Sequence, residues 1–140
     1  MRRIERTRGL YAMIAYDFLV GGVIPLLFLV SAVRNSDAEV SFTMVLSVAL
    51  YFCVMGAAIW AWWGNDTGRW LLLSGVTLVA LQWINNTLQV LSASEVMPGD
   101  TQRRMGVIFR AAITITLNWW YFNRKSTVRY YKQAKRYRKR

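Results

Sequence analysis

The side chains of this sequence that could do chemistry are polar residues set inside long apolar stretches. Six of them stand out: Asp17, Asn85, Asn86, Gln89, Arg110 and Asn118. A polar group surrounded by hydrocarbon needs a hydrogen-bonding partner, so such residues mark ion paths, partner contacts or structural clamps. These six therefore form the only candidate site that the sequence offers.

Two of the six, Asp17 and Asn118, are predicted to share a layer near one face of the membrane. Asp17 lies seven residues into the first apolar stretch, roughly 10 Å deep at the rise of an α-helix. Asn118 lies four residues before the end of the last stretch, about 6 Å deep by the same rise. We expect Tyr16 and Thr116 to lie near this pair.

The other four residues are predicted to lie in the opposite layer. Asn85 and Asn86 fall roughly 22–24 Å from the first face, and Arg110 enters its stretch from the other side. Amide oxygens of the Asn pair or of Gln89 could accept the N–H groups of Arg110, so we expect Arg110 to lie against that side of the third helix. A structural polar clamp, a substrate or ion path, and contact with a partner subunit are the three interpretations.

Four apolar stretches must position these residues. They cover residues 10–33, 40–63, 70–91 and 105–122 and contain 24, 24, 22 and 18 residues. Each is close to the ~20 residues that cross a ~30 Å hydrocarbon core as a helix. The chain is 55% hydrophobic yet carries a net charge of +11, so apolar and charged residues are segregated. The sequence predicts one domain, 1–140, with an all-α fold, an integral membrane four-helix bundle.

Basic residues at both ends predict the orientation. Residues 1–9 contain four Arg, and residues 123–140 contain nine Lys or Arg without Asp or Glu. Short Lys- and Arg-rich segments are rarely translocated, so both termini are expected in the cytoplasm, as an even number of spans allows. The expected location is a bacterial cytoplasmic (inner) membrane.

The basic tail, residues 123–140, is either an interfacial amphipathic helix or a plain topology anchor. Tyr130, Tyr131, Ala134 and Tyr137 recur at helical spacing with basic residues between them. Because the tail has no Pro or Gly, we expect the last helix to continue past Phe122, with its Tyr side among headgroups and its basic side toward anionic lipid or an acidic partner surface. The residues expected to make these contacts are Arg124, Lys125, Arg129, Tyr130, Tyr131, Lys132, Lys135 and Arg136. The pattern is not specific for nucleic acid.

The composition argues against a catalytic or metal centre. Histidine is absent and Cys53 is the only cysteine, so we expect no disulfide within the chain and no haem, zinc, copper or iron–sulfur ligation by this chain alone. No nucleophile–base arrangement is visible either. We therefore expect no catalytic residue, no metal and no cofactor.

Pro25 interrupts the first stretch. A proline in a helix interior removes a hydrogen bond and predicts a kink. Gly21 and Gly22, just before it, could let another helix approach closely.

The end of the last stretch carries a resemblance. Trp119-Trp120-Tyr121-Phe122, followed by Ser126-Thr127-Val128-Arg129-Tyr130-Tyr131, resembles the C-terminal part of uncharacterised small four-span bacterial inner-membrane proteins. Those families have no established activity, so the resemblance implies a topology and no catalytic residues.

In size, span count and an acidic residue in the first span, the chain is also similar to the small multidrug-resistance transporters. That resemblance would give Asp17 a role in proton-coupled export. The family, however, has Glu near the middle of its first helix and no long basic tail, and Arg110 has no counterpart there.

The preferred functional prediction is a non-catalytic accessory or assembly subunit of a larger bacterial membrane complex, acting through helix packing and its basic tail. The expected partners are anionic inner-leaflet lipids and either a larger membrane protein or further copies of the chain. The alternative is a small proton-coupled transporter of the multidrug-resistance type that uses Asp17.

Overall fold

A computed structural model describes residues 8–35, 41–93 and 100–138. These residues are helical apart from short turns and contain no strand, which confirms the predicted all-α class. In chain order the elements are α1 (Arg8–Phe18), the π-helix η1 (Leu19–Val23), α2 (Ile24–Asn35), α3 (Phe42–Trp62), α4 (Asp66–Ala93), α5 (Asp100–Asn123) and α6 (Lys125–Arg138).

Three helical segments of the described residues are long and apolar enough to cross a membrane: Gly9–Arg34, Phe42–Trp62 and Asp66–Ser92. They coincide with the first three predicted stretches and are consistent with a multi-pass membrane protein. The fourth predicted stretch, 105–122, lies within α5, which is not among them. Arg110, Asn118 and the Trp119-Trp120 pair lower the mean hydropathy of α5.

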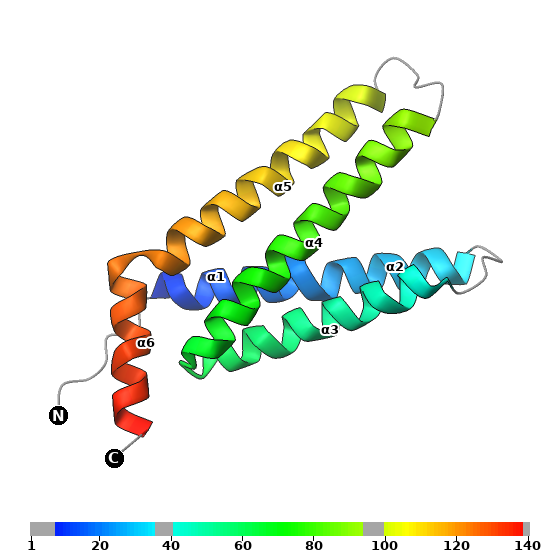
Figure 1. Cartoon of the computed structure of the whole chain (residues 1–140). Coiled ribbons are helices and arrows are strands. Elements are labelled where there is room, and N and C mark those ends of the chain that lie inside the picture. The colour runs from blue at the N-terminus through cyan, green and yellow to red at the C-terminus, as the bar shows by residue number, and fades with distance from the viewer. Residues whose placement is uncertain (1–7, 36–40, 94–99, 139–140) are drawn as a thin grey trace.

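The first span passes Pro25 through a π-helix. Within η1 the wider turn lets the Ile24 N–H donate to the Leu19 carbonyl five residues back. Since proline has no N–H to give, an extra residue in the turn accommodates it, and α1, η1 and α2 follow one another nearly in line instead of bending sharply (Figure 1). Gly21 allows the predicted close approach, because a Cβ there would lie 3.2 Å from Val54 and 3.3 Å from Val76.

Local capping sets the ends of the next two helices. The Ser41 hydroxyl accepts from the Met44 N–H at 3.3 Å at the start of α3. Gly64, with φ +74°, turns the chain between α3 and α4 in a conformation that glycine adopts readily. The Asn65 side chain then accepts from the Thr67 N–H at 3.0 Å, so the first turn of α4 is capped.

The last helix was predicted to continue past Phe122 into the tail. The tail is helical, but a break in the helix separates it from α5. The chain bends at Arg124, and α6 turns away from α5 to lie across one end of the molecule (Figure 1). Two carbonyls at the end of α5 are taken by side chains: Thr127 Oγ1 donates to Tyr121 O at 3.1 Å, and a guanidinium nitrogen of Arg69 donates to Phe122 O at 2.8 Å. These carbonyls would otherwise accept the next helical N–H groups, so the helix ends without Pro or Gly.

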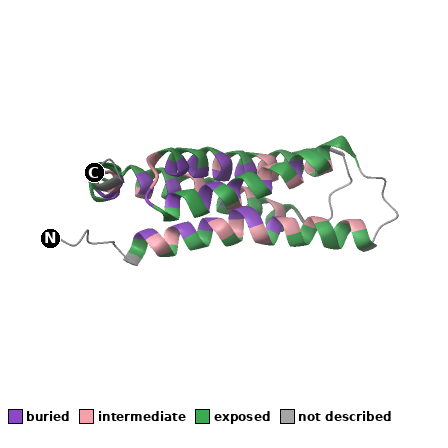
Figure 2. Cartoon of the chain, turned by 90° about the horizontal axis from the view of Figure 1, so that it is seen from below, coloured by how far each residue is buried: buried purple, intermediate pink, exposed green. Residues whose placement is uncertain are grey.

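We call the end at which α6 lies the docked end and the opposite end, where α2 and α4 finish, the open end. Toward the open end the α4–α5 pair diverges from the α2–α3 pair (Figure 1). The buried core gathers nearer the docked end, and the open end is mostly exposed (Figure 2). The core consists of Leu10, Ile14, Tyr51, Val54, Ala57, Ala58, Ala61, Leu72, Leu73, Val76, Val79, Phe122, Tyr130 and Tyr131.

Candidate functional site: polar residues within and beside the helices

Asp17 and Asn118 are brought together within the bundle, although they lie on different helices. Asp17 is in the last turn of α1, immediately before η1, and Asn118 is in the second half of α5. Each residue is only 1% exposed, and Asn118 is the polar neighbour of the Asp17 carboxyl group. The layer expected from their depths therefore exists, and it is buried.

This pair holds more acceptors than donors, and its one donor group, the Asn118 amide nitrogen, is shared. Neither carboxylate oxygen of Asp17 has a hydrogen-bond partner among the described residues. The Asn118 amide nitrogen donates to the Thr114 carbonyl at 3.1 Å, and its amide oxygen has no partner within that part of the chain. Unpartnered buried polar atoms are unfavourable and few in folded proteins, so this group stands out.

Beside Asp17 lies a small cavity. Its volume is about 20 Å³, which is room for one water molecule. Residues from η1, α4 and α5 line it together with Asp17: Val20, Gly21, Val76, Val79, Ala80, Trp83, Ala111 and Thr114. The surroundings are mostly apolar, so the carboxyl group is the dominant polar feature.

The two other residues expected in this layer lie elsewhere. Tyr16 is exposed, and Thr116, also exposed, donates to the Ala112 carbonyl at 2.9 Å within its own helix. Neither side chain therefore contributes to the buried site at Asp17, because successive helical residues point in different directions around the axis.

The four residues of the opposite layer, Asn85, Asn86, Gln89 and Arg110, are all exposed. We call them the outer polar group. No hydrogen bond or ion pair joins Arg110 to the Asn pair among the residues that the structure describes. The hydrogen bonds expected between Arg110 and the Asn pair are therefore not formed there, although α4 and α5 are neighbours.

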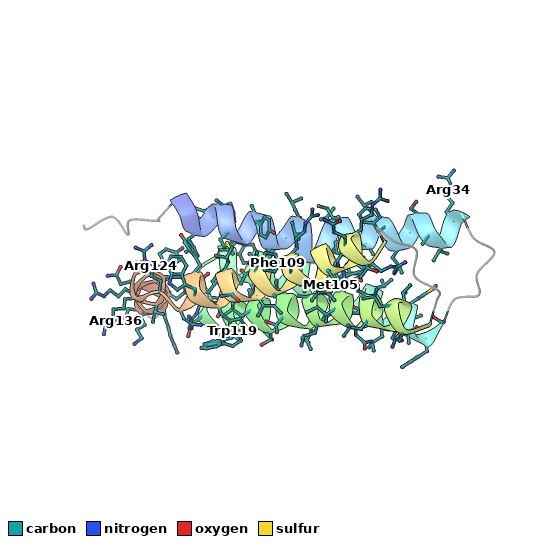
Figure 3. The ribbon with its side chains drawn as sticks, turned by 90° about the horizontal axis from the view of Figure 1, so that it is seen from above. Arg34, Met105, Phe109, Trp119, Arg124 and Arg136 are labelled. Carbon is teal, nitrogen blue, oxygen red and sulfur yellow. The ribbon has the colours of Figure 1, made fainter. Side chains whose placement is uncertain are left out.

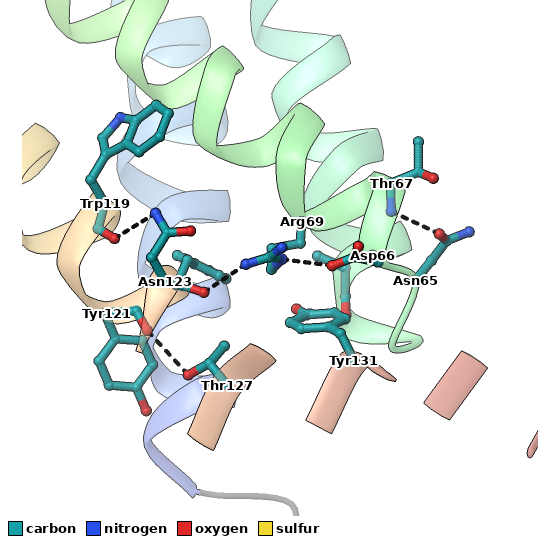
Figure 4. Close-up of polar contacts among 11 residues, drawn as sticks. Asn65, Asp66, Thr67, Arg69, Trp119, Tyr121, Asn123, Thr127 and Tyr131 are labelled. Atoms are coloured by element: carbon teal, nitrogen blue, oxygen red, sulfur yellow. Dashed lines mark hydrogen bonds and ion pairs between the residues drawn. The ribbon is translucent and has the colours of Figure 1, made fainter. Parts of the chain in front are cut away.

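Arg69 is a buried polar residue that the sequence analysis did not single out. It lies in the first turn of α4 and is 4% exposed. Its Nε donates to Asp66 Oδ1 at 2.8 Å, while another guanidinium nitrogen reaches the Phe122 carbonyl (Figure 4). The guanidinium also lies 4.7 Å from the ring centre of Trp70 and 5.6 Å from that of Tyr131, within the range of cation–π attraction.

Tyr131 completes the contact between α6 and the turn from α3 to α4. It is fully buried, and its hydroxyl donates to the Ala61 carbonyl at 3.2 Å. Burial raises the pKa of the Tyr131 phenol, so it remains a neutral donor. The signal in the sequence was an acid three residues before Arg69, the spacing of an intrahelical ion pair, but its aromatic partner lies far along the chain. We call Asp66, Arg69, Phe122, Thr127 and Tyr131 the docking cluster.

The tyrosines of the tail do not lie where they were predicted to lie, while the contact of its basic residues with lipid or a partner stays a prediction. Tyr130 and Tyr131 are buried against the bundle instead of lying among headgroups, because Tyr131 finds its hydrogen bond and its apolar surroundings within the protein. The six basic residues are exposed: Arg124, Lys125, Arg129, Lys132, Lys135 and Arg136. Figure 3 shows Arg124 and Arg136 at the end opposite Arg34.

The described residues contain no group of three or more His, Cys, Asp or Glu side chains that could hold a metal ion. Cys53 is exposed on α3. The chain matches no protein-family model, no curated protein and no solved structure. Its function must therefore be argued from the polar residues, the surfaces and the charge distribution of this molecule.

Proposed function

We propose that the chain is a non-catalytic accessory or assembly subunit of a larger complex in a bacterial cytoplasmic membrane, with four spans and both termini in the cytoplasm. The observation that carries the proposal is the outer polar group. These four side chains are exposed on α4 and α5, without a partner among the described residues. Polar residues in a membrane face a bundle interior or another chain, because hydrocarbon offers them nothing.

The fourth span would be α5. It has 24 residues and thus a length of about 36 Å, enough for a ~30 Å core. It runs back along α4 from the open end to the docked end, so it would cross the layer that α4 crosses (Figure 1). Four crossings return the chain to the side on which α1 begins, in agreement with the basic residues at both ends of the sequence.

The outer surface of the spans supports contact with a further membrane chain. Within the most apolar 18 residues of each of the three spans, 28% are buried inside this chain. Lipid alone would suit the remaining apolar side chains. It would not suit Arg110, whose charge costs about 3 kcal/mol at mid-bilayer and less toward an interface.

The basic tail would act at the cytoplasmic surface. The α6 helix lies across the docked end, and its buried tyrosines hold its six exposed basic residues in place. Such residues attract anionic lipid at about 1 kcal/mol each when they lie near the surface. In this proposal α6 sets the orientation of the subunit on the inner leaflet while α4 and α5 contact the partner.

The alternative of a small proton-coupled exporter has less support. Asp17 is 1% exposed, and its cavity has room for one water molecule. An exporter of organic molecules would need a far larger site, of several hundred Å³.

A photocrosslinking residue tests the partner contact. Placed at Asn86 or Arg110 in cells, it should yield a specific adduct with another membrane protein, identified by mass spectrometry. The matched control is Phe52, an exposed apolar residue of α3, which should yield none. An adduct of twice the chain's mass would assign the surface to a homo-oligomer, and no adduct at either polar position would contradict the proposal.

Reporter fusions test the topology separately. A reporter active only outside the cytoplasm should be silent after Arg140 and active when inserted near Met97. Reporter activity at both positions would indicate an odd number of crossings, so that α5 is not a span. Activity after Arg140 together with silence near Met97 would invert the topology.

A further inference from the structure

The Asp17 pair is not needed for the accessory role, and its chemistry points to a ligand. Three buried oxygens, two on Asp17 and one on Asn118, lack a hydrogen-bond donor among the described residues. The second N–H group of the Asn118 amide lies near the carboxyl group, but one N–H group cannot offset a full negative charge. An unpaired carboxylate in an apolar interior is strongly unfavourable, so the site requires a positive charge or a proton.

No side chain in the described part of the chain supplies that charge at the cavity. The elements packed around the carboxyl group present the apolar Val76, Val79 and Ala80 from α4 and Ala111 from α5, while the polar ones are Trp83, Thr114 and Asn118. None of these is a cation. Arg69, the buried cation of the docked end, is bound to Asp66 and to the Phe122 carbonyl instead.

Main-chain carbonyl groups of the π-helix provide further hydrogen-bond acceptors beside the same cavity. Val20 and Gly21 line the cavity, and Pro25 lies five and four residues after them. A helical N–H at position 25 would donate to one of their carbonyls, but proline has none. The Ile24 N–H is already used by Leu19. Helix interruptions whose carbonyls lack donors are the places where membrane proteins coordinate Na⁺ or H⁺.

We propose that Asp17, Asn118 and the turn at Val20 and Gly21 form a binding site for one small monovalent cation, a proton or a sodium ion. A proton would bind a carboxylate oxygen of Asp17, and the resulting O–H would donate to the Asn118 amide oxygen. A sodium ion would instead occupy the one-water cavity and take oxygens from Asp17, from the Asn118 amide and from the turn. Either ligand neutralises the acid and joins α1 to α5.

Infrared spectroscopy of the full-length protein in lipid nanodiscs tests the proton arm. At neutral pH the wild type should show the C=O stretch of a protonated carboxylic acid. Asp17→Asn should lose this band, and Asp100→Asn, a matched change at the first residue of α5, should keep it. Asn118→Ala should move the band to higher frequency, because the acid loses its acceptor, and this variant serves if Asp17→Asn does not fold.

Thermal unfolding in NaCl or choline chloride at equal ionic strength tests the sodium arm. If sodium is the ligand, NaCl should raise the wild-type Tm by several °C, without the infrared band, and Asp17→Asn and Asn118→Ala should lose most of this rise. A band without a sodium effect identifies the proton. The absence of both the band and the sodium effect would overturn the site, whatever the crosslinking experiment shows about partners.

Discussion

Two arginines illustrate how the ends of this molecule differ. At the docked end, Arg69 is buried and its guanidinium is enclosed by a carboxylate, a main-chain carbonyl and two aromatic rings. At the open end, Arg110 is exposed and has no partner among the described residues. The buried arginine is thus enclosed by groups of this chain, whereas the exposed one is not. We interpret the docked end as the part that holds the fold together and the open end as the part available to another chain.

The largest expected effect is on the docked end, from truncating Tyr131. Tyr131→Ala should lower the free energy of unfolding by about 3–5 kcal/mol, because it empties a fully buried site between α6 and the turn from α3 to α4. Equilibrium unfolding in mixed micelles measures this. The matched control, Tyr131→Phe, removes only the hydrogen bond to Ala61 and should cost about 1 kcal/mol. Equal effects of the two variants would show that packing is not what holds α6.

The two arginines can be compared directly. Arg69→Met should destabilise the protein by about 2–3 kcal/mol, chiefly through its bond to Phe122 O and its ring contacts. The bond to Asp66 contributes less, because that acid is 43% exposed. Faster tryptic cleavage within α6 should accompany the loss.

Arg110→Met is the control for that comparison, and it should change the stability of the isolated chain by less than about 0.5 kcal/mol. If the two substitutions had equal effects, the difference between the ends would not exist.

Glycines at the two ends should respond with opposite signs. Gly64→Ala should cost about 1–2 kcal/mol, because φ is +74° there and a Cβ would lie 3.0 Å from Ala134 and 3.2 Å from the Tyr130 hydroxyl. Gly106→Ala, in a part of α5 where no atom lies within 4 Å of a new Cβ, should instead stabilise the helix by up to about 1 kcal/mol. Thermal unfolding of both variants measures the signs. Destabilisation by Gly106→Ala would place a close neighbour at the open end.

The smallest effect on the isolated chain is expected from Asn86→Leu. Since Asn86 is exposed and unpartnered among the described residues, unfolding should change by less than about 0.5 kcal/mol. Co-purification of the proposed partner should nevertheless fall severalfold, because the polar contact would be lost. If co-purification were undiminished, the outer polar group would not be part of the interface with the partner.

The helical class, the three helical segments long and apolar enough to cross a membrane, and the basic residues at both ends could all be predicted from the sequence. These features depend on local composition: the length of an apolar run sets whether a helix can cross hydrocarbon, and clusters of Lys and Arg resist translocation. The depth of a residue along a helix also follows from its position in the sequence. For that reason Asp17 and Asn118 could be predicted to lie in one layer. The basic side chains of α6 were likewise predictable as exposed groups.

The end of α5, the exposure of Arg110 and the contacts of Tyr131 could not be predicted from the sequence. The helix stops after Phe122 because the side chains of Thr127 and the distant Arg69 take its last carbonyls, although no helix-breaking residue is present. Tyr131 turns inward because Ala61, seventy residues away, offers a buried acceptor. The depth of a residue along a helix does not give the direction of its side chain around the helix axis. Arg110 and the Asn pair could therefore share a layer without forming hydrogen bonds. Each of these outcomes depends on partners remote in the chain, and for that reason the spacing of neighbouring residues did not reveal them.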